Sequence, residues 1–271
     1  MKLTVLGTAA AEAQPALFCE CETCRQARLN GGKDIRKRCC YLIDDDTFID
    51  FGPDINAQAM MYGVDWTKIK QVIFTHSHSD HLSPIELSWR NKGFSKATRM
   101  LDIYGDTSVH EKIQAIIDYE KTEISGHQVT HGDIFKAADM DVLALRADHD
   151  PASTPLNYVI SRNGKTILIA NDTGFWGDEN WDLIKKYGKK IDLAVIECTY
   201  ALIRNQSKGH LSCDYTVRFR DKLVELGLAD NTLRCITNHF SHNGGPLQKD
   251  LEEYFTPFNI EVAYDGMIAE I

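Results

Sequence analysis

The segment His76-Ser77-His78-Ser79-Asp80-His81 carries more chemical information than any other part of this 271-residue sequence. It follows Gln71–Phe74, an apolar run with the length and composition of a buried strand. Imidazoles and carboxylates at this density are the ligands that Zn, Mn and Fe prefer. Side chains that alternate along a loop at a strand end can also converge on one ion. The segment therefore predicts a metal site and not a solvated polar loop.

The rest of the chain alternates apolar runs of strand length, such as Leu193–Glu197, with helical stretches such as Cys213–Leu226. This alternation predicts sheets covered by helices. We expect one domain over residues 1–271, because neither a long linker nor a solenoid repeat is found. The first residues resemble a strand and not a signal peptide. No apolar run reaches the length of a membrane span, so we expect a cytoplasmic protein.

The histidine segment after its hydrophobic strand resembles the signature of the metallo-β-lactamase superfamily. This resemblance implies an α/β fold, an αββα sandwich with metal ions between the edges of two sheets. Further family positions are matched in order along the chain, each at the end of an apolar run, and Asp50 matches the residue that buttresses the histidine loop. By the resemblance, metal 1 is held by His76, His78 and His149, metal 2 by Asp80, His81 and His239, and Asp172 bridges the two.

Such a pair of divalent ions, about 3.5–4 Å apart, makes a bridging hydroxide nucleophilic at neutral pH and stabilises charge on a reacting oxygen. We expect Zn or Mn in these positions, with Fe as a further option. Asp80 and Asp172 are therefore expected to serve catalysis as well as metal binding.

A second constellation follows the first strand. Cys19, Cys21 and Cys24 supply three thiolates in a compact turn, whereas a structural Zn site requires four ligands. His242 lies three residues after His239, so one short loop can send an imidazole to each site. We therefore expect a structural zinc knuckle over about residues 18–38. The remaining thiols are expected to be reduced core residues: Cys39, Cys40, Cys198, Cys213 and Cys235.

A cysteine knuckle combined with a late His-x-x-His resembles the PhnP-type phosphodiesterases, which open phosphoribosyl 1,2-cyclic phosphate. The similarity runs almost end to end, with two departures: Cys39-Cys40 stands where small polar residues are common, and Asn171 replaces the usual Ser. At the position of His210, such enzymes carry a His thought to protonate the leaving oxygen. The resemblance thus implies a two-metal hydrolase that cleaves a small cyclic phosphodiester. Arg204 and Lys208 are candidate phosphate contacts, or else part of a solvated basic loop.

Three alternatives stay open. Enzymes that process tRNA 3′ ends share the histidine loop, but no long basic arm lies between Asp172 and His210, and the net charge is −9. A PqqB-like protein of cofactor biosynthesis is the second, and hydrolysis of a β-lactam or thioester is the third. We expect a small-molecule substrate, no stable nucleic-acid partner and no membrane association, and we leave a homodimer open.

Overall fold

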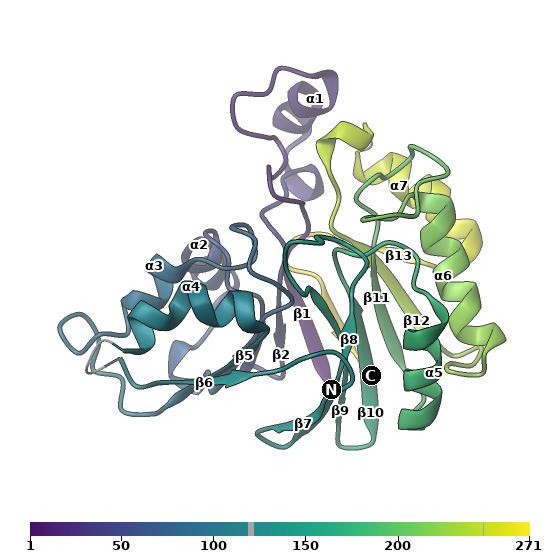
Figure 1. Cartoon of the computed structure of the whole chain (residues 1–271). Coiled ribbons are helices and arrows are strands. Elements are labelled where there is room, and N and C mark those ends of the chain that lie inside the picture. The colour runs from purple at the N-terminus through teal and green to yellow at the C-terminus, as the bar shows by residue number, and fades with distance from the viewer. Residues whose placement is uncertain (119–121, 246) are drawn as a thin grey trace.

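The computed structural model describes residues 1–118, 122–245 and 247–271, in which two seven-stranded sheets pack face to face between helices (Figure 1). Figure 1 shows α2, α3 and α4 on the outer side of one sheet and α5, α6 and α7 on the outer side of the other. The predicted αββα sandwich is confirmed. No helix in these ranges is both long and apolar enough to cross a bilayer.

The first sheet has the order β14-β1-β2-β3-β4-β5-β6. Its strands are β1 (Lys2–Gly7), β2 (Cys40–Ile43), β3 (Thr47–Ile49), β4 (Gln71–Ile73), β5 (Leu101–Gly105), β6 (Ile124–Gln128) and β14 (Ile268–Glu270). Its helices are α2 (Ile55–Tyr62), α3 (Pro84–Ser88) and α4 (Thr107–Ile117).

The second sheet has the order β13-β12-β11-β10-β9-β8-β7. Its strands are β7 (Ile134–Ala137), β8 (Met140–Arg146), β9 (Leu156–Arg162), β10 (Lys165–Ala170), β11 (Leu193–Glu197), β12 (Arg234–Asn238) and β13 (Glu261–Val262). Its helices are α5 (Asp178–Tyr187), α6 (Cys213–Glu225) and α7 (Gln248–Phe255).

The central strands of the second sheet show why their sequences are continuously apolar. In β11, Leu193 and Val195 pack into the core between the two sheets. Ala194 and Ile196 point the other way and pack against the helices. β10, β11 and β12 are parallel, and this sheet is covered on both faces. The residues of β11 are therefore buried whichever face they point to.

Several strands end in residues with left-handed backbone. Asp50 has φ 65°, Asp172 has φ 45° and His239 has φ 60°. L-residues adopt this conformation at a cost and usually where surrounding contacts enforce it, often at active sites. All three are buried. Asp50 directly follows β3, His239 directly follows β12, and Asp172 lies two residues after β10. The sharp turns bring their side chains to the site described below.

The segment between β1 and β2 leaves the sandwich and carries α1 (Glu22–Asn30) and the short 3₁₀ helix η1 (Gly32–Asp34) (Figure 1). The Cys21 thiol accepts a hydrogen bond from Cys24 N, which caps the first turn of α1. The returning chain pairs back near the sandwich, through bridges between Gln14 and Arg36 and between Ala9 and Arg38. A cysteine-rich unit therefore stands where the sequence predicts it.

Candidate metal centre

The histidine loop begins directly after β4, and Asp50 fixes its conformation. One carboxylate oxygen of Asp50 accepts from Thr75 N at 2.7 Å, and the other lies 2.7 Å from His81 Nδ1. The Thr75 hydroxyl lies 3.0 Å from His76 Nδ1. His76 and His81 are fully buried, and because Nδ1 of each ring is engaged in this way, Nε2 is the nitrogen left to ligate.

The imidazoles from elsewhere are oriented in the same way. His149 Nδ1 lies 3.2 Å from Gly209 O, and because a carbonyl only accepts, this nitrogen carries the proton and Nε2 is free to ligate. His239 Nδ1 lies 2.8 Å from the Thr199 hydroxyl. His78 is reversed: its Nε2 faces Asp150 at 3.2 Å, and its Nδ1 lies 3.2 Å from His149 Nε2.

These atoms converge. Asp172 Oδ2 lies 3.1 Å from His81 Nε2 and 3.2 Å from His239 Nε2. Asp80 Oδ2 lies 3.1 Å from His81 Nε2. Groups whose ligand atoms all lie within 4.8 Å of one another are His76–His78–His149, His76–His81–Asp172 and Asp80–His81–His239. The arrangement brings together the seven residues proposed as ligands from the sequence.

Several buried polar atoms of this cluster have no hydrogen-bond partner among the residues that the structure describes, as expected of a site that binds cations. His76 Nε2, His81 Nε2, His239 Nε2 and Asp172 Oδ2 are buried and have no hydrogen-bond partner in the described chain. Buried polar atoms are normally satisfied, so this cluster of orphans requires another partner. Burial and the neighbouring His81 hold the pKa of His76 well below its usual value, which keeps that ring neutral and able to ligate. The residues therefore fit a site for two divalent ions.

His210 lies beside this cluster and is held by a residue that the sequence analysis missed. Its Nδ1 is 2.7 Å from the carboxylate of Glu197, which is fully buried and also accepts from Thr173 N and Thr199 N. Burial alone would lower the pKa of His210, but the Glu197 carboxylate outweighs it and raises the pKa to about 9. The His210 ring lies 4.7 Å from that of His149. A carboxylate closing the apolar run Leu193–Glu197 was the signal available in the sequence.

The loop after Asp172 packs against both the loop before His210 and the loop that carries His149. Phe175 N donates to Ser207 O, and Gly174 N donates to Asp148 O, both at 2.7 Å. A Cβ on Gly174 would lie 2.5 Å from the Ser207 carbonyl oxygen and 2.9 Å from Gly209 N, both backbone atoms, so only glycine permits this approach. His149, Asp172 and His210 also lie close enough to form a three-ligand group, so His210 has the reach of a ligand as well as of a proton donor.

The two candidate phosphate contacts, Arg204 and Lys208, are both exposed. The Arg204 guanidinium lies over the ring of Tyr254 in α7, 5.3 Å from its centre. Their role as phosphate contacts stays a prediction.

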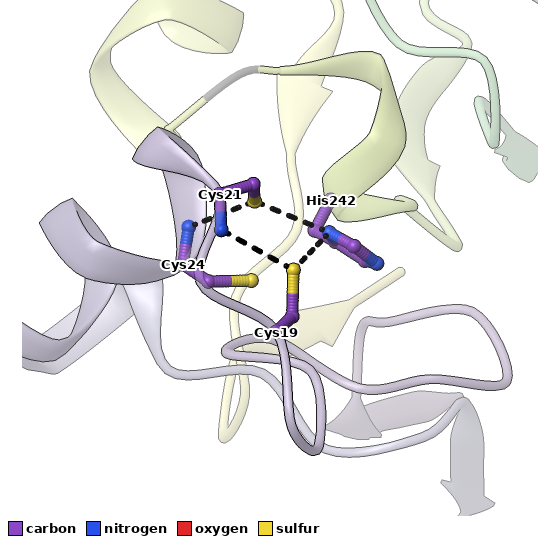
Figure 2. A group of neighbouring side chains, drawn as sticks. All are labelled: Cys19, Cys21, Cys24 and His242. Carbon is purple, nitrogen blue, oxygen red and sulfur yellow. Dashed lines mark hydrogen bonds between the residues drawn. The ribbon is translucent and has the colours of Figure 1, made fainter.

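The cysteine cluster receives its imidazole from a distant segment. Figure 2 shows Cys19, Cys21 and Cys24 facing His242, whose Nδ1 lies 3.6 Å from Cys19 Sγ and 3.5 Å from Cys21 Sγ. Burial would raise the pKa of Cys21, but hydrogen bonds from Cys24 N and His242 lower it to about 6, so thiolate is available at neutral pH. His242 Nε2 faces a carboxylate oxygen of Glu12 at 3.5 Å. Three sulfurs and one nitrogen suit a closed tetrahedral zinc site.

The five other cysteines are all buried free thiols. Burial raises the pKa of Cys235 and of Cys39 to about 12. They are therefore protonated at neutral pH and behave as small core residues.

Part of this chain is similar in sequence to two ribonucleases. Over 107 residues it is 28% identical to a ribonuclease Z of Methanothermobacter thermautotrophicus, covering 37% of this chain and 34% of that protein. Over 104 residues it is 26% identical to a ribonuclease Z of Acaryochloris marina, covering 37% and 33%. These matches span only about a third of each relative.

Solved structures match over the whole chain. A diphosphatase of the PhnP family superposes with a TM-score of 0.75 at 19% identity, covering 100% of this chain and 97% of that one. Zinc-bound PqqB from Methylobacterium extorquens gives 0.75 at 16%, with 100% of both chains covered. The short form of human tRNase Z gives 0.67 at 18%, covering 100% and 99%. At such identities these likenesses establish the fold alone.

The family itself is established by a different comparison. Residues 46–225, well over half of the chain, match the beta-lactamase superfamily domain. That range contains the histidine loop, His149, Asp172 and His210. With its sandwich fold and its cluster of His and Asp ligands, the chain belongs to the metallo-β-lactamase superfamily.

Proposed function

We propose that this member of the superfamily is a two-metal phosphodiesterase that acts on a small cyclic phosphate. The observation that carries the proposal is the His210–Glu197 pair beside the cluster of unpartnered ligand atoms. A hydrolase that expels an alkoxide requires both a place for cations and a proton donor next to it.

Two divalent ions, when bound, would supply a nucleophile at neutral pH and counter-charge for a reacting oxygen. The side chains and backbone of the protein orient the metal ligands and hold the proton donor. Asp50, Thr199 and Gly209 O orient the imidazoles through their second nitrogens. Glu197 engages His210 Nδ1, which leaves Nε2 as the atom that can give a proton to a departing oxygen.

A phosphorus-centred substrate is supported by the kinds of protein that resemble this chain. One structural neighbour is named a diphosphatase of the PhnP family, and the sequence relatives are named ribonucleases. The cysteine cluster with His242 agrees with the PhnP-type pattern in the sequence. The net charge of −9 favours a small substrate over a polynucleotide, which is gripped mainly by Lys and Arg.

A turnover screen of the Zn- and Mn-loaded protein tests the proposal. The substrates are bis-(p-nitrophenyl) phosphate, 2′,3′-cyclic nucleotides, phosphoribosyl cyclic phosphate, a precursor tRNA and a β-lactam. We expect turnover of cyclic phosphates and little cleavage of precursor tRNA at physiological salt. Efficient tRNA processing would favour the hypothesis that the protein is a ribonuclease. Turnover of the β-lactam alone would refute the proposed phosphodiesterase activity.

A further inference from the structure

Four buried side chains form a closed hydrogen-bonded ring between the two sheets. Asn171 Nδ2 donates to Cys39 Sγ at 2.9 Å, and Asn238 Nδ2 donates to the same sulfur at 3.3 Å. Asn238 Nδ2 also donates to Tyr41 Oη, and Tyr41 Oη donates to Asn171 Oδ1, both at 2.7 Å. We call these residues the Cys39 ring. All four are at most 1% exposed.

The ring joins the sheets at the point where two ligand-bearing strands end. Cys39 directly precedes β2 and Tyr41 lies at its start in one sheet, whereas Asn171 follows β10 and Asn238 ends β12 in the other. β10 and β12 are not neighbours, because β11 lies between them. The ring is therefore a direct side-chain link between the two strand ends, in addition to the backbone ladder.

The residue after each asparagine is a candidate metal ligand. Asp172 follows Asn171 and His239 follows Asn238, and both ligands have the left-handed backbone described above. Such a conformation persists when neighbouring contacts fix the chain on both sides. The Cys39 ring supplies that constraint one residue upstream of each ligand, and Asn157 Nδ2 adds a bond to Asn171 O at 2.6 Å.

We propose that the Cys39 ring positions Asp172 against His239 and so sets the affinity of the site for its ions. Asp172 Oδ2 and His239 Nε2 lie 3.2 Å apart, and a small rotation at either strand end would change that separation. Because a buried thiol with a raised pKa stays protonated, Cys39 serves here as a neutral anchor and not as a further ligand. The inference rests on the proposed metal site and not on the proposed substrate.

Cobalt titration tests this proposal without measuring turnover. Thiolate-to-cobalt charge-transfer absorption reports the cluster of Cys19, Cys21, Cys24 and His242. Cobalt that binds without a rise in this absorption, and the ligand-field bands that appear with it, report the His/Asp site. Cys39→Ala removes the shared acceptor, and Tyr41→Phe removes one hydroxyl with little change in volume. In both we expect the affinity for at least one His/Asp-site ion to fall roughly 10–100-fold, as for other residues that orient ligands. The charge-transfer band should be unchanged.

Two further variants separate positioning from stability. Cys39→Ser keeps a hydrogen-bond acceptor for Asn171 and Asn238, so the affinity of the His/Asp site for cobalt should stay near the wild-type value. Cys235→Ala is the matched control, since it deletes another fully desolvated thiol from β12, within the core beneath the helices. It should lower thermal stability and leave the ligand-field bands and cobalt affinity unchanged.

Wild-type cobalt affinity and spectra in both Cys39→Ala and Tyr41→Phe would overturn the inference, whatever their stability. Equal affinity losses in Cys235→Ala would overturn it too, because general softening of the core would then explain the effect. A wild-type protein that binds cobalt only at the thiolate cluster would leave no His/Asp site to be positioned, and the inference would be wrong. A wild type that binds cobalt but cleaves no phosphodiester would refute the proposed activity alone.

Discussion

At the scale of single residues, His210 is the side chain on which the proposed chemistry depends most. Its Nδ1 is committed to a buried carboxylate, and its ring lies among the rings of His149 and His239. That placement suits a proton donor, because Glu197 stabilises the imidazolium and fixes its orientation. The same placement also gives His210 the reach of a metal ligand, and one substitution distinguishes the two roles.

We predict that His210→Ala slows cleavage of a diester with an alkoxide leaving group by roughly 10²–10⁴-fold, the usual contribution of general-acid catalysis. A p-nitrophenyl diester should be slowed much less, because p-nitrophenolate leaves without protonation. The measurement is kcat/KM for both substrates, together with metal content. Equal losses with metals retained would assign His210 to substrate positioning, and loss of an ion would make it a ligand.

The ligands were predictable from the sequence because their chemistry is local, whereas the groups that orient them were not. A dense run of His and Asp after an apolar strand has few structural explanations. Thr199 and Asp150 become partners of His239 and His78 only through tertiary contacts between distant loops. Glu197 is intermediate: a carboxylate at the end of a buried strand needs a partner, but the sequence does not say which.

At the scale of elements, Arg162 is one of the side chains that link the two sheets. Arg162 at the end of β9 reaches the β2–β3 hairpin of the other sheet, with Nη1 3.0 Å from Asp44 and 3.1 Å from Asp46. Its Nη2 lies 2.5 Å from Asp139. The Arg162 side chain is only 5% exposed and Asp46 is 12% exposed, so this pair is largely desolvated, whereas Asp139 is 65% exposed.

We predict that Arg162→Met lowers the free energy of unfolding by about 2 kcal/mol at neutral pH. Burial would raise the pKa of Asp46, but hydrogen bonds from Arg162 and Lys70 outweigh it and lower the pKa. This stabilisation is present above the unfolded pKa of about 3.9 and is lost as pH falls through the lower folded value. Urea unfolding of both proteins at neutral and acidic pH should show the difference shrinking below about pH 4. A difference independent of pH would contradict the ion-pair account. Lys165→Met, at the more exposed pair with Asp192, serves as the control.

The central elements could be predicted more closely than the edges. Leu193–Glu197 is β11 as expected, and the helix expected over Cys213–Leu226 is α6, ending one residue earlier. These elements have continuous or periodic apolar patterns because they are deeply packed. The edge strands β6 and β7 were not expected. Their exposed residues and few strongly apolar positions give little signal, and pairing with β5 and β8 decides their conformation.

At the scale of the whole molecule, the cysteine cluster joins a segment near the start of the chain to a loop that lies more than two hundred residues later. Cys19, Cys21 and Cys24 come from the segment after β1, and His242 from the loop after β12 that also carries His239. An ion bound there would fasten this segment to the sandwich next to the His/Asp cluster. Its contribution is therefore expected in folding and not in chemistry.

We predict that Cys21→Ser lowers the thermal unfolding temperature by several degrees, since a structural zinc contributes folding free energy. Activity per correctly folded molecule at low temperature should be largely retained. Calorimetry of the zinc-loaded proteins, with Cys235→Ser as a buried-thiol control, measures the effect. Loss of activity without a shift in unfolding temperature would place the cysteine cluster in catalysis.

The most direct test of the two-metal account is the metal content of the fully loaded protein. Elemental analysis should find three ions per chain, two at the His/Asp cluster and one at the cysteine cluster. Asp172→Ala should remove at least one ion from the first and none from the second, and should abolish turnover of every diester. One ion or fewer per wild-type chain after careful loading, or full activity in Asp172→Ala, would contradict the account.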